Sequence, residues 1–115
     1  MKKDKYIYDA YVTAVYDGDT ITVDIDLGLD IFLKNQKIRL FGIDAPEVRG
    51  KDKDAGIYVR DWLRLFILDK HIVINTIKDS KGKYGRYLGT IFTDDSKNSI
   101  NNEMISLRLV KRKTY

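Results

Sequence analysis

The sequence predicts an α+β domain that is mainly a β barrel with helices. Two patterns support this prediction: short stretches of alternating apolar and polar residues in the first half of the chain, and two later stretches with apolar residues at helical spacing. The chain has 115 residues and is 43% hydrophobic, which is enough for one modest core. A single domain over residues 1–115 is therefore expected.

Three strands are expected in the first 43 residues. Residues 6–15 are rich in Tyr, Val and Ile, and the turn sequence Asp17-Gly18-Asp19 follows them. Residues 21–27 alternate strictly between apolar and polar side chains, which indicates a half-buried strand. Residues 28–36 are expected to form a hairpin connection or an extended ribbon, and residues 37–43 the third strand.

Helices and further strands are expected in the rest of the chain. Ala55, Val59 and Leu63 share one helical face, so a helix should begin near residue 54, with Trp62 and Phe66 packing it onto the sheet. Residues 71–77 and 87–93 resemble strands. A last helix should be capped by Asn101 or Asn102. The resulting order, β-β-β-α-β-β-α, is typical of a five-stranded OB-fold barrel, whose outer face and loops bind nucleic acid.

Composition restricts the chemistry that the chain can perform. It has no cysteine and a single histidine, which excludes disulfides and thiolate metal sites and argues against His-rich ones. Lys and Arg exceed Asp and Glu by 21 − 17 = 4, a weak indication of a polyanionic partner. No apolar run approaches the ~20 residues of a membrane span. A cytoplasmic location is expected unless a signal peptide has been removed.

Polar clusters occur at three predicted turns or strand ends, where functional sites are usually built. They are Asp17-Gly18-Asp19-Thr20, Arg39 with Asp44-Ala45-Pro46-Glu47, and Lys83-Tyr84-Gly85-Arg86. If these ends converge, one pocket holds the side chains of Asp19, Arg39, Asp44, Glu47 and Arg86.

That set of side chains suits phosphodiester hydrolysis. Two aspartates can hold a hard cation, and oxygen-only ligands favour calcium or magnesium. A glutamate can accept the proton of an attacking water, and arginines can form bidentate contacts with phosphate oxygens. Each cluster alone also has a structural explanation, because Asp-Gly-Asp is common in turns and Arg39 could simply pair with a carboxylate. The three clusters together favour the catalytic interpretation.

Four stretches resemble the staphylococcal nuclease (thermonuclease-like) family. They are "YDGDTITV", "IRLFGIDAPE", "DSKGKYGRYLG" and, less closely, "NNEMISLRLV", and they follow the family order along nearly the whole chain. The resemblance implies an OB barrel with helices. It also implies a calcium-dependent nuclease that cleaves DNA and RNA with low sequence specificity and leaves 3′-phosphate ends.

The resemblance also implies roles for individual residues. Asp19 and Asp44 would supply the calcium carboxylates, and Ala45 a backbone carbonyl ligand. Ala45 replaces a frequent threonine, so the carbonyl is kept and a hydroxyl is lost. Glu47 would act as the general base or position the attacking water. The remaining roles are transition-state stabilisation by Arg39 and Arg86, and a nucleotide pocket lined by Lys83, Tyr84 and Tyr115.

An alternative is a non-catalytic OB-type module that binds single-stranded nucleic acid. Basic grooves and aromatic side chains serve such binding, and the chain has eight tyrosines. A pure binder has no need for Asp19, Asp44 and Glu47 at a phosphate pocket, where they would repel the substrate without a cation. The enzyme is therefore favoured, with DNA and RNA as partners, single strands preferred, no membrane association and a monomeric state.

Overall fold

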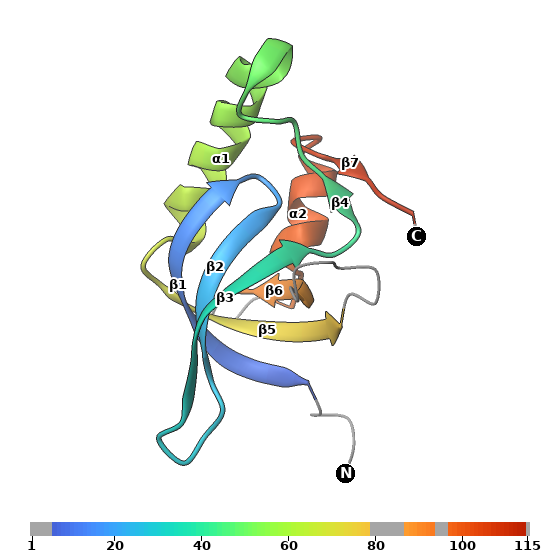
Figure 1. Cartoon of the computed structure of the whole chain (residues 1–115). Helices are drawn as coiled ribbons and strands as arrows, with labels where there is room; N and C mark the ends of the chain where they lie inside the picture. The colour runs from blue at the N-terminus through green and yellow to red at the C-terminus, as the bar shows by residue number, and fades with distance from the viewer. Residues whose placement is uncertain (1–5, 79–86, 94–96, 115) are drawn as a thin grey trace.

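The computed structural model describes residues 6–78, 87–93 and 97–114 (Figure 1). Its elements are β1 (Ile7–Asp17), β2 (Thr20–Asp26), β3 (Phe32–Leu40), β4 (Ile43–Asp44), the 3₁₀ helix η1 (Gly50–Asp52), α1 (Lys53–Ile67), β5 (His71–Lys78), β6 (Tyr87–Phe92), α2 (Ile100–Ser106) and β7 (Lys111–Arg112). The first three strands are sequential, and α1 separates them from β5 and β6, as the sequence predicts.

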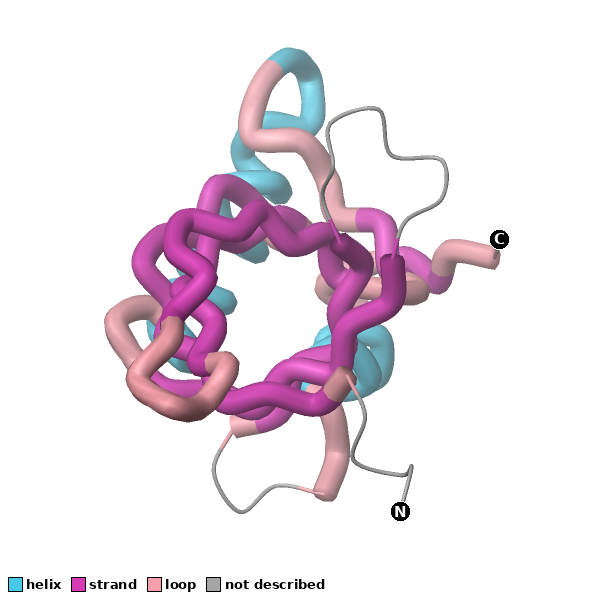
Figure 2. The backbone as a smooth tube through the Cα atoms, turned by 60° about the horizontal axis from the view of Figure 1, so that its bottom comes forward, coloured by secondary structure: helices cyan, strands magenta, loops and turns pink. Residues whose placement is uncertain are grey.

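Five strands close into a barrel in the order β1-β2-β3-β6-β5 (Figure 2). The neighbours pair in antiparallel fashion except β3 and β6, which run parallel with Arg39 opposite Leu88. Closure removes the free edges that an open sheet of this size would expose. The predicted five-stranded α+β barrel with two helices is confirmed.

The core fills the barrel and continues under both helices. On β2, Ile21, Val23 and Ile25 are buried while their polar neighbours are not, so the alternation in the sequence follows the inner face of the barrel. Helix α1 contributes Val59, Leu63 and Ile67, each four residues apart, and α2 contributes Ile100 and Met104. In the described part of the chain, 18 buried side chains form one continuous core.

Helix α1 is attached to the barrel by polar as well as apolar contacts. The Nε and Nη2 atoms of Arg64 donate to the carbonyl of Val15, at 3.2 and 3.0 Å, near the end of β1. Trp62 packs against the core as predicted, but Phe66 remains 42% exposed and rests on the Trp62 ring with centroids 4.5 Å apart. The prediction that Phe66 packs the helix onto the sheet is therefore wrong.

The third strand differs from its predicted bounds at both ends. Strand β3 begins at Phe32, inside the predicted connection, because a tight turn with positive φ at Leu29 and Asp30 joins it to β2. It ends at Leu40 because Gly42, with φ of 77°, turns the chain out of the barrel. Ile43 and Asp44 then form β4, which pairs with the unpredicted β7 in a separate small sheet.

The second helix is capped by Ser99, not by either asparagine. The Ser99 hydroxyl accepts the backbone N–H of Asn102 at 3.0 Å, and the helix ends at Ser106. No helix within the described parts of the chain is long and apolar enough to cross a membrane.

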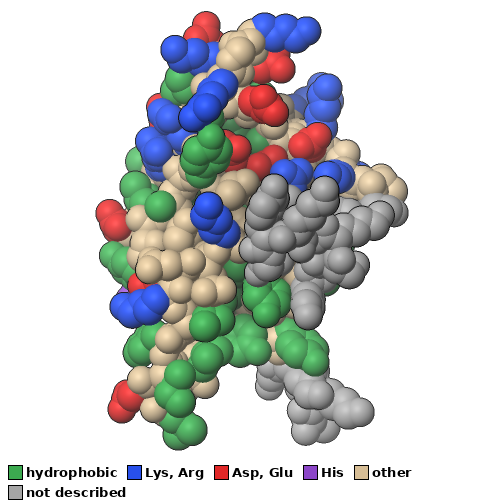
Figure 3. Space-filling model, in the orientation of Figure 1, with side chains coloured by type: hydrophobic (Ala, Val, Ile, Leu, Met, Phe, Trp, Pro, Cys, Tyr) green, Lys and Arg blue, Asp and Glu red, His purple; other side chains and the backbone are tan. Residues whose placement is uncertain are grey.

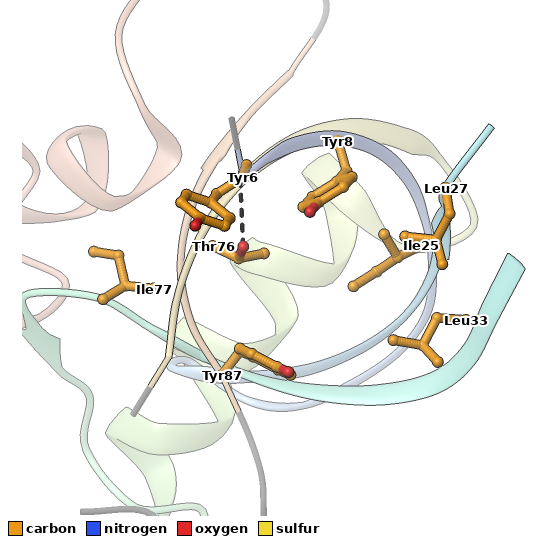
Figure 4. Close-up of a pocket in the computed structure, with 8 residues that line it drawn as sticks. All are labelled: Tyr6, Tyr8, Ile25, Leu27, Leu33, Thr76, Ile77 and Tyr87. Carbon is orange, nitrogen blue, oxygen red and sulfur yellow. Dashed lines mark hydrogen bonds between the residues drawn. The ribbon is translucent and has the colours of Figure 1, made fainter. Parts of the chain in front are cut away.

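A hollow of about 580 Å³ lies at the barrel end formed by the start of β1 and the β2–β3 hairpin. Figure 4 shows the side chains of Tyr8, Ile25, Leu33 and Tyr87 turned toward it. Asp17 and Arg39, at the other ends of β1 and β3, do not line it. This hollow is therefore separate from the site that the sequence predicts.

Candidate active site

The turn between β1 and β2 holds Asp19 in a fixed position. The Asp17 carboxylate accepts the backbone N–H of Asp19 at 3.0 Å, which closes the turn. Gly18 lies so close to Val59 and Ala45 that a Cβ on it would overlap both side chains. Glycine is therefore needed here to let the turn pack between α1 and the loop after β4.

Asp19 is almost fully buried, with 4% of its surface exposed, yet each of its oxygens has a partner. Its Oδ2 accepts the backbone N–H of Ala45 at 2.9 Å, and its Oδ1 accepts the Thr20 hydroxyl at 3.2 Å. These bonds offset part of the cost of burying a carboxylate. They also tie the β1–β2 turn to the segment that carries Asp44 and Ala45.

Arg39 lies between the two aspartates that the sequence assigns to a metal. Its Nη1 atom is 3.5 Å from Asp19 Oδ2, and its Nη2 atom is 3.2 Å from Asp44 Oδ1. Nη2 also donates to the Ile43 carbonyl at 3.3 Å. The side chain is only 15% exposed, so the planar guanidinium is held in one orientation by three groups. The structure thus brings Asp19, Arg39, Asp44 and Ala45 together.

Glu47 extends from the loop between β4 and η1. Its side chain is exposed and makes no hydrogen bond or ion pair with any other residue in the described ranges. Its backbone is fixed, because Gly56 of α1 packs directly against it and a Cβ there would overlap the Glu47 carbonyl. The carboxylate is therefore free to contact a ligand, while its anchor is rigid.

A hollow of about 560 Å³ adjoins these carboxylates. Asp44 and Glu47 line one side, and Arg108 and Lys111, from the segment that follows α2, line the other. Sequence analysis missed these two cations, because only the pairing of β4 with β7 brings them beside the loop. The hollow is large enough for a nucleotide, and its walls offer both signs of charge.

Asp17 is a further residue whose role sequence analysis missed. Burial, together with the adjacent Asp19 carboxylate, raises the pKa of Asp17 from 3.8 to about 6. Two carboxylates so close to each other repel when both are ionised, and a cation beside them would relieve that repulsion. The two-residue spacing in "DGD" was the available signal, but sequence analysis assigned only Asp19 to the site and treated Asp17 as a turn residue.

The donor set suits a hard cation with few protein ligands. Every candidate ligand is an oxygen: the Asp19 and Asp44 carboxylates and the Ala45 carbonyl, with Asp17 close behind. Among the described residues, no three carboxylate or imidazole side chains are grouped closely enough to hold a metal on their own. A cation here would therefore complete its coordination with backbone oxygen and water, as calcium does readily.

The Asn101 side chain links α2 to β6 and to the turn between β3, which carries Arg39, and β4, which carries Asp44. Its Oδ1 accepts the Ile91 N–H at 3.1 Å, and its Nδ2 donates to the carbonyls of Phe41, at 2.9 Å, and Gly89, at 3.1 Å. The side chain is buried, and it satisfies one backbone group at the turn where β3 ends and two in β6. The sequence prediction of a helix cap at this position is wrong, because Asn101 points into the barrel wall.

Four predicted site residues lie outside the described residues. They are Lys83, Tyr84, Arg86 and Tyr115. The substrate-binding and second-arginine assignments therefore remain predictions.

A family comparison agrees with this geometry. The staphylococcal nuclease homologue family model matches residues 37–112, which include Arg39, Asp44, Ala45 and Glu47. The chain belongs to this family. The matched part runs from β3 to β7, so it contains the Arg39–Asp44 pair and the hollow beside it.

Three curated relatives are similar to this family member. The uncharacterized protein MJ1439 of Methanocaldococcus jannaschii is 30% identical over 115 residues, covering 82% of this chain and 53% of that protein. The thermonuclease of Staphylococcus hyicus is 28% identical over 107 residues, covering 90% and 59%. Endonuclease YhcR of Bacillus subtilis is 32% identical over 108 residues, covering 85% and 8%. The chain spans little more than half the length of the first two relatives.

Proposed function

We propose that this chain is a metal-dependent nuclease that hydrolyses phosphodiester bonds of DNA and RNA with low sequence specificity. The observation that carries the proposal is the buried Asp19 carboxylate beside Asp17 and in contact with Arg39, which also binds Asp44. Burying two adjacent carboxylates costs free energy of folding. Such a pair, next to an oriented arginine and an exposed glutamate, is typical of a functional site. Membership in the family supports the same function.

We propose roles for the chain's own residues, and their positions support these roles. Glu47 accepts a proton from the attacking water, since its carboxylate is exposed and its backbone is fixed. The water oxygen forms a bond to phosphorus while the bond from phosphorus to the 5′ oxygen breaks, and the departing 5′ oxygen takes a proton from solvent water, which leaves a 3′-phosphate and a 5′-hydroxyl. Arg39 donates to the phosphoryl oxygens on which negative charge grows. Arg86 would do the same from outside the described residues.

Calcium is the cofactor that the ligand set favours. Asp19, Asp44 and the Ala45 carbonyl would hold it, and when bound it would neutralise the carboxylates and polarise the phosphate. In this structure Arg39 contacts both aspartates, and its positive charge reduces the repulsion between the two carboxylates. We infer that Arg39 turns part of its hydrogen-bonding capacity from these carboxylates to the phosphate when calcium and substrate are present.

The partner that this site supports is nucleic acid. Single-stranded DNA and RNA are proposed as preferred substrates, cut by a monomer. The binding-module alternative has one observation in its favour: Arg39 contacts both aspartates and offsets part of their negative charge, so a strand could bind without a cation. The two functions differ in whether the strand is cut.

Metal dependence tests the proposal. Purified protein is incubated with single-stranded DNA and RNA in calcium, in magnesium, or in chelator. We expect cleavage in calcium, poor cleavage in magnesium and none in chelator, because few protein ligands and a flexible shell at ~2.3–2.6 Å suit calcium better than the tight octahedron of magnesium. Equal turnover in chelator would rule out a metal-dependent reaction.

A further inference from the structure

A basic groove of about 900 Å³ runs between α1 and the strands β1 and β2. Among the described residues, five cationic side chains and no acidic one line it: Lys37, Arg49, Lys53, Arg60 and Arg64. They come from β3, from the loop before η1 and from α1, so their convergence is produced by the fold and not by a charge run in the sequence. Figure 1 shows α1 standing beside the upper part of β1 and β2, and Figure 3 shows many Lys and Arg side chains, with Asp and Glu side chains among them, over this part of the molecule.

The five cations divide into two kinds. Arg60 and Arg64 each contact Asp61, at 3.1 and 3.9 Å, and Arg64 also bonds to the Val15 carbonyl. Lys37, Arg49 and Lys53 are exposed and form no ion pair with any residue in the described part of the chain. The convergence of these three cations with two paired ones creates a net positive potential that attracts an anion.

The groove adjoins the candidate active site through Thr20 and Val48. Thr20 lines it and donates its hydroxyl to Asp19. Thr20 pairs with Arg39 across β2 and β3, and Thr22 pairs with Lys37, so Lys37 lies two residues from Arg39 on the same face of β3. Val48 lines the groove next to Glu47 in the chain. A strand that leaves the reactive phosphate on this side therefore enters the groove directly.

We propose that this groove binds the strand of nucleic acid adjoining the bond that is cut, with Lys37, Arg49 and Lys53 contacting its phosphates. The inference rests on the proposed function, and it adds a second binding region to the nucleotide pocket that the family resemblance implies. Tyr16, which is 56% exposed, also lines the groove and offers an aromatic face for stacking an unpaired base. A basic groove with an aromatic platform suits a single strand.

The test compares two variants with the same charge. The groove variant carries Lys37→Gln, Arg49→Gln and Lys53→Gln, and the matched control carries Lys34→Gln, Lys70→Gln and Lys97→Gln at exposed positions that do not line the groove. Each lowers the formal net charge from +4 by three, to +1. Binding of a fluorescent single-stranded oligonucleotide of about twelve nucleotides is measured by anisotropy in chelator, at several salt concentrations.

The groove variant is expected to bind at least ~10-fold more weakly than wild type at low salt, with a log–log salt slope flattened by about 2, because each phosphate contact adds roughly −0.7. The control should stay close to wild type. Equal losses in both variants would show that net charge alone matters and would overturn the proposal. This assay measures binding without cleavage, so it tests the groove separately from the proposed function. A protein that binds through the groove but never cuts would contradict the proposed function and support the groove proposal.

A third variant tests the kind of strand. Tyr16→Ala should weaken binding of the single strand and leave binding of the matching duplex unchanged, because only unpaired bases are free to stack. An equal effect on both would contradict the single-strand part of the inference.

Discussion

Replacing Arg39 with alanine is expected to lower kcat for cleavage by about 10²-fold or more, the scale seen when one preorganised transition-state donor is lost. The guanidinium is held by Asp19, Asp44 and the Ile43 carbonyl, so it is already oriented before a substrate arrives. Calcium affinity should not fall, since the substitution removes a positive charge from beside two calcium ligands. A loss of turnover without a loss of metal binding would assign Arg39 to the phosphate.

The measurement is single-turnover cleavage at saturating calcium, with a calcium titration and thermal unfolding of the same preparations. Arg39→Lys is the control: it keeps the charge and should recover only part of the rate, because an ammonium cannot reproduce the planar fork. Arg86→Ala is expected to show a similar loss. Wild-type turnover in Arg39→Ala would remove this arginine from the mechanism.

The double variant Asp19→Asn, Asp44→Asn is expected to abolish cleavage and to keep nucleic-acid binding. In chelator it should bind single-stranded DNA at least as tightly as wild type does in chelator, because two carboxylates that repel phosphate have been neutralised. The fold should tolerate the change, since an asparagine oxygen at position 19 can still accept the Ala45 N–H.

Anisotropy in chelator and cleavage in calcium are measured side by side for this variant. The matched control is Asp30→Asn, Asp69→Asn, which removes the same charge from two exposed positions away from the site. Cleavage by the Asp19/Asp44 variant would show that these residues are not the metal site. Loss of binding in chelator would show that they hold the groove or the fold together instead.

The parts of the fold that the sequence predicted well are those set by local patterns. The alternation on β2 follows directly from one face being buried, and the four-residue spacing of Val59, Leu63 and Ile67 follows from α1 lying on the barrel. The grouping of Asp19, Arg39 and Asp44 was also predictable, because turns and strand ends carry polar residues that have no use in a core.

The features that sequence analysis missed depend on contacts between distant segments. In the sequence Gly42 resembles an ordinary strand residue. In the structure its positive φ turns the chain away from the barrel, so β4 pairs with β7. Asparagine is a residue type that often caps helices, which is why the sequence suggested this role for Asn101. Only the packing of α2 against β3 and β6 shows that its side chain bonds to three backbone groups. The raised pKa of Asp17 likewise depends on burial, which no local pattern reports.

The measurement that tests the central claim most directly compares wild type with Glu47→Gln, purified identically, on a 5′-labelled single strand in calcium. The substitution should leave the fold intact, because this exposed side chain contacts no other described residue. If the chain cuts phosphodiester bonds with Glu47 as base, wild type yields products with 3′-phosphate ends and the variant is slower by ~10²-fold or more. Equal cleavage by both preparations, or no cleavage by wild type, would contradict it.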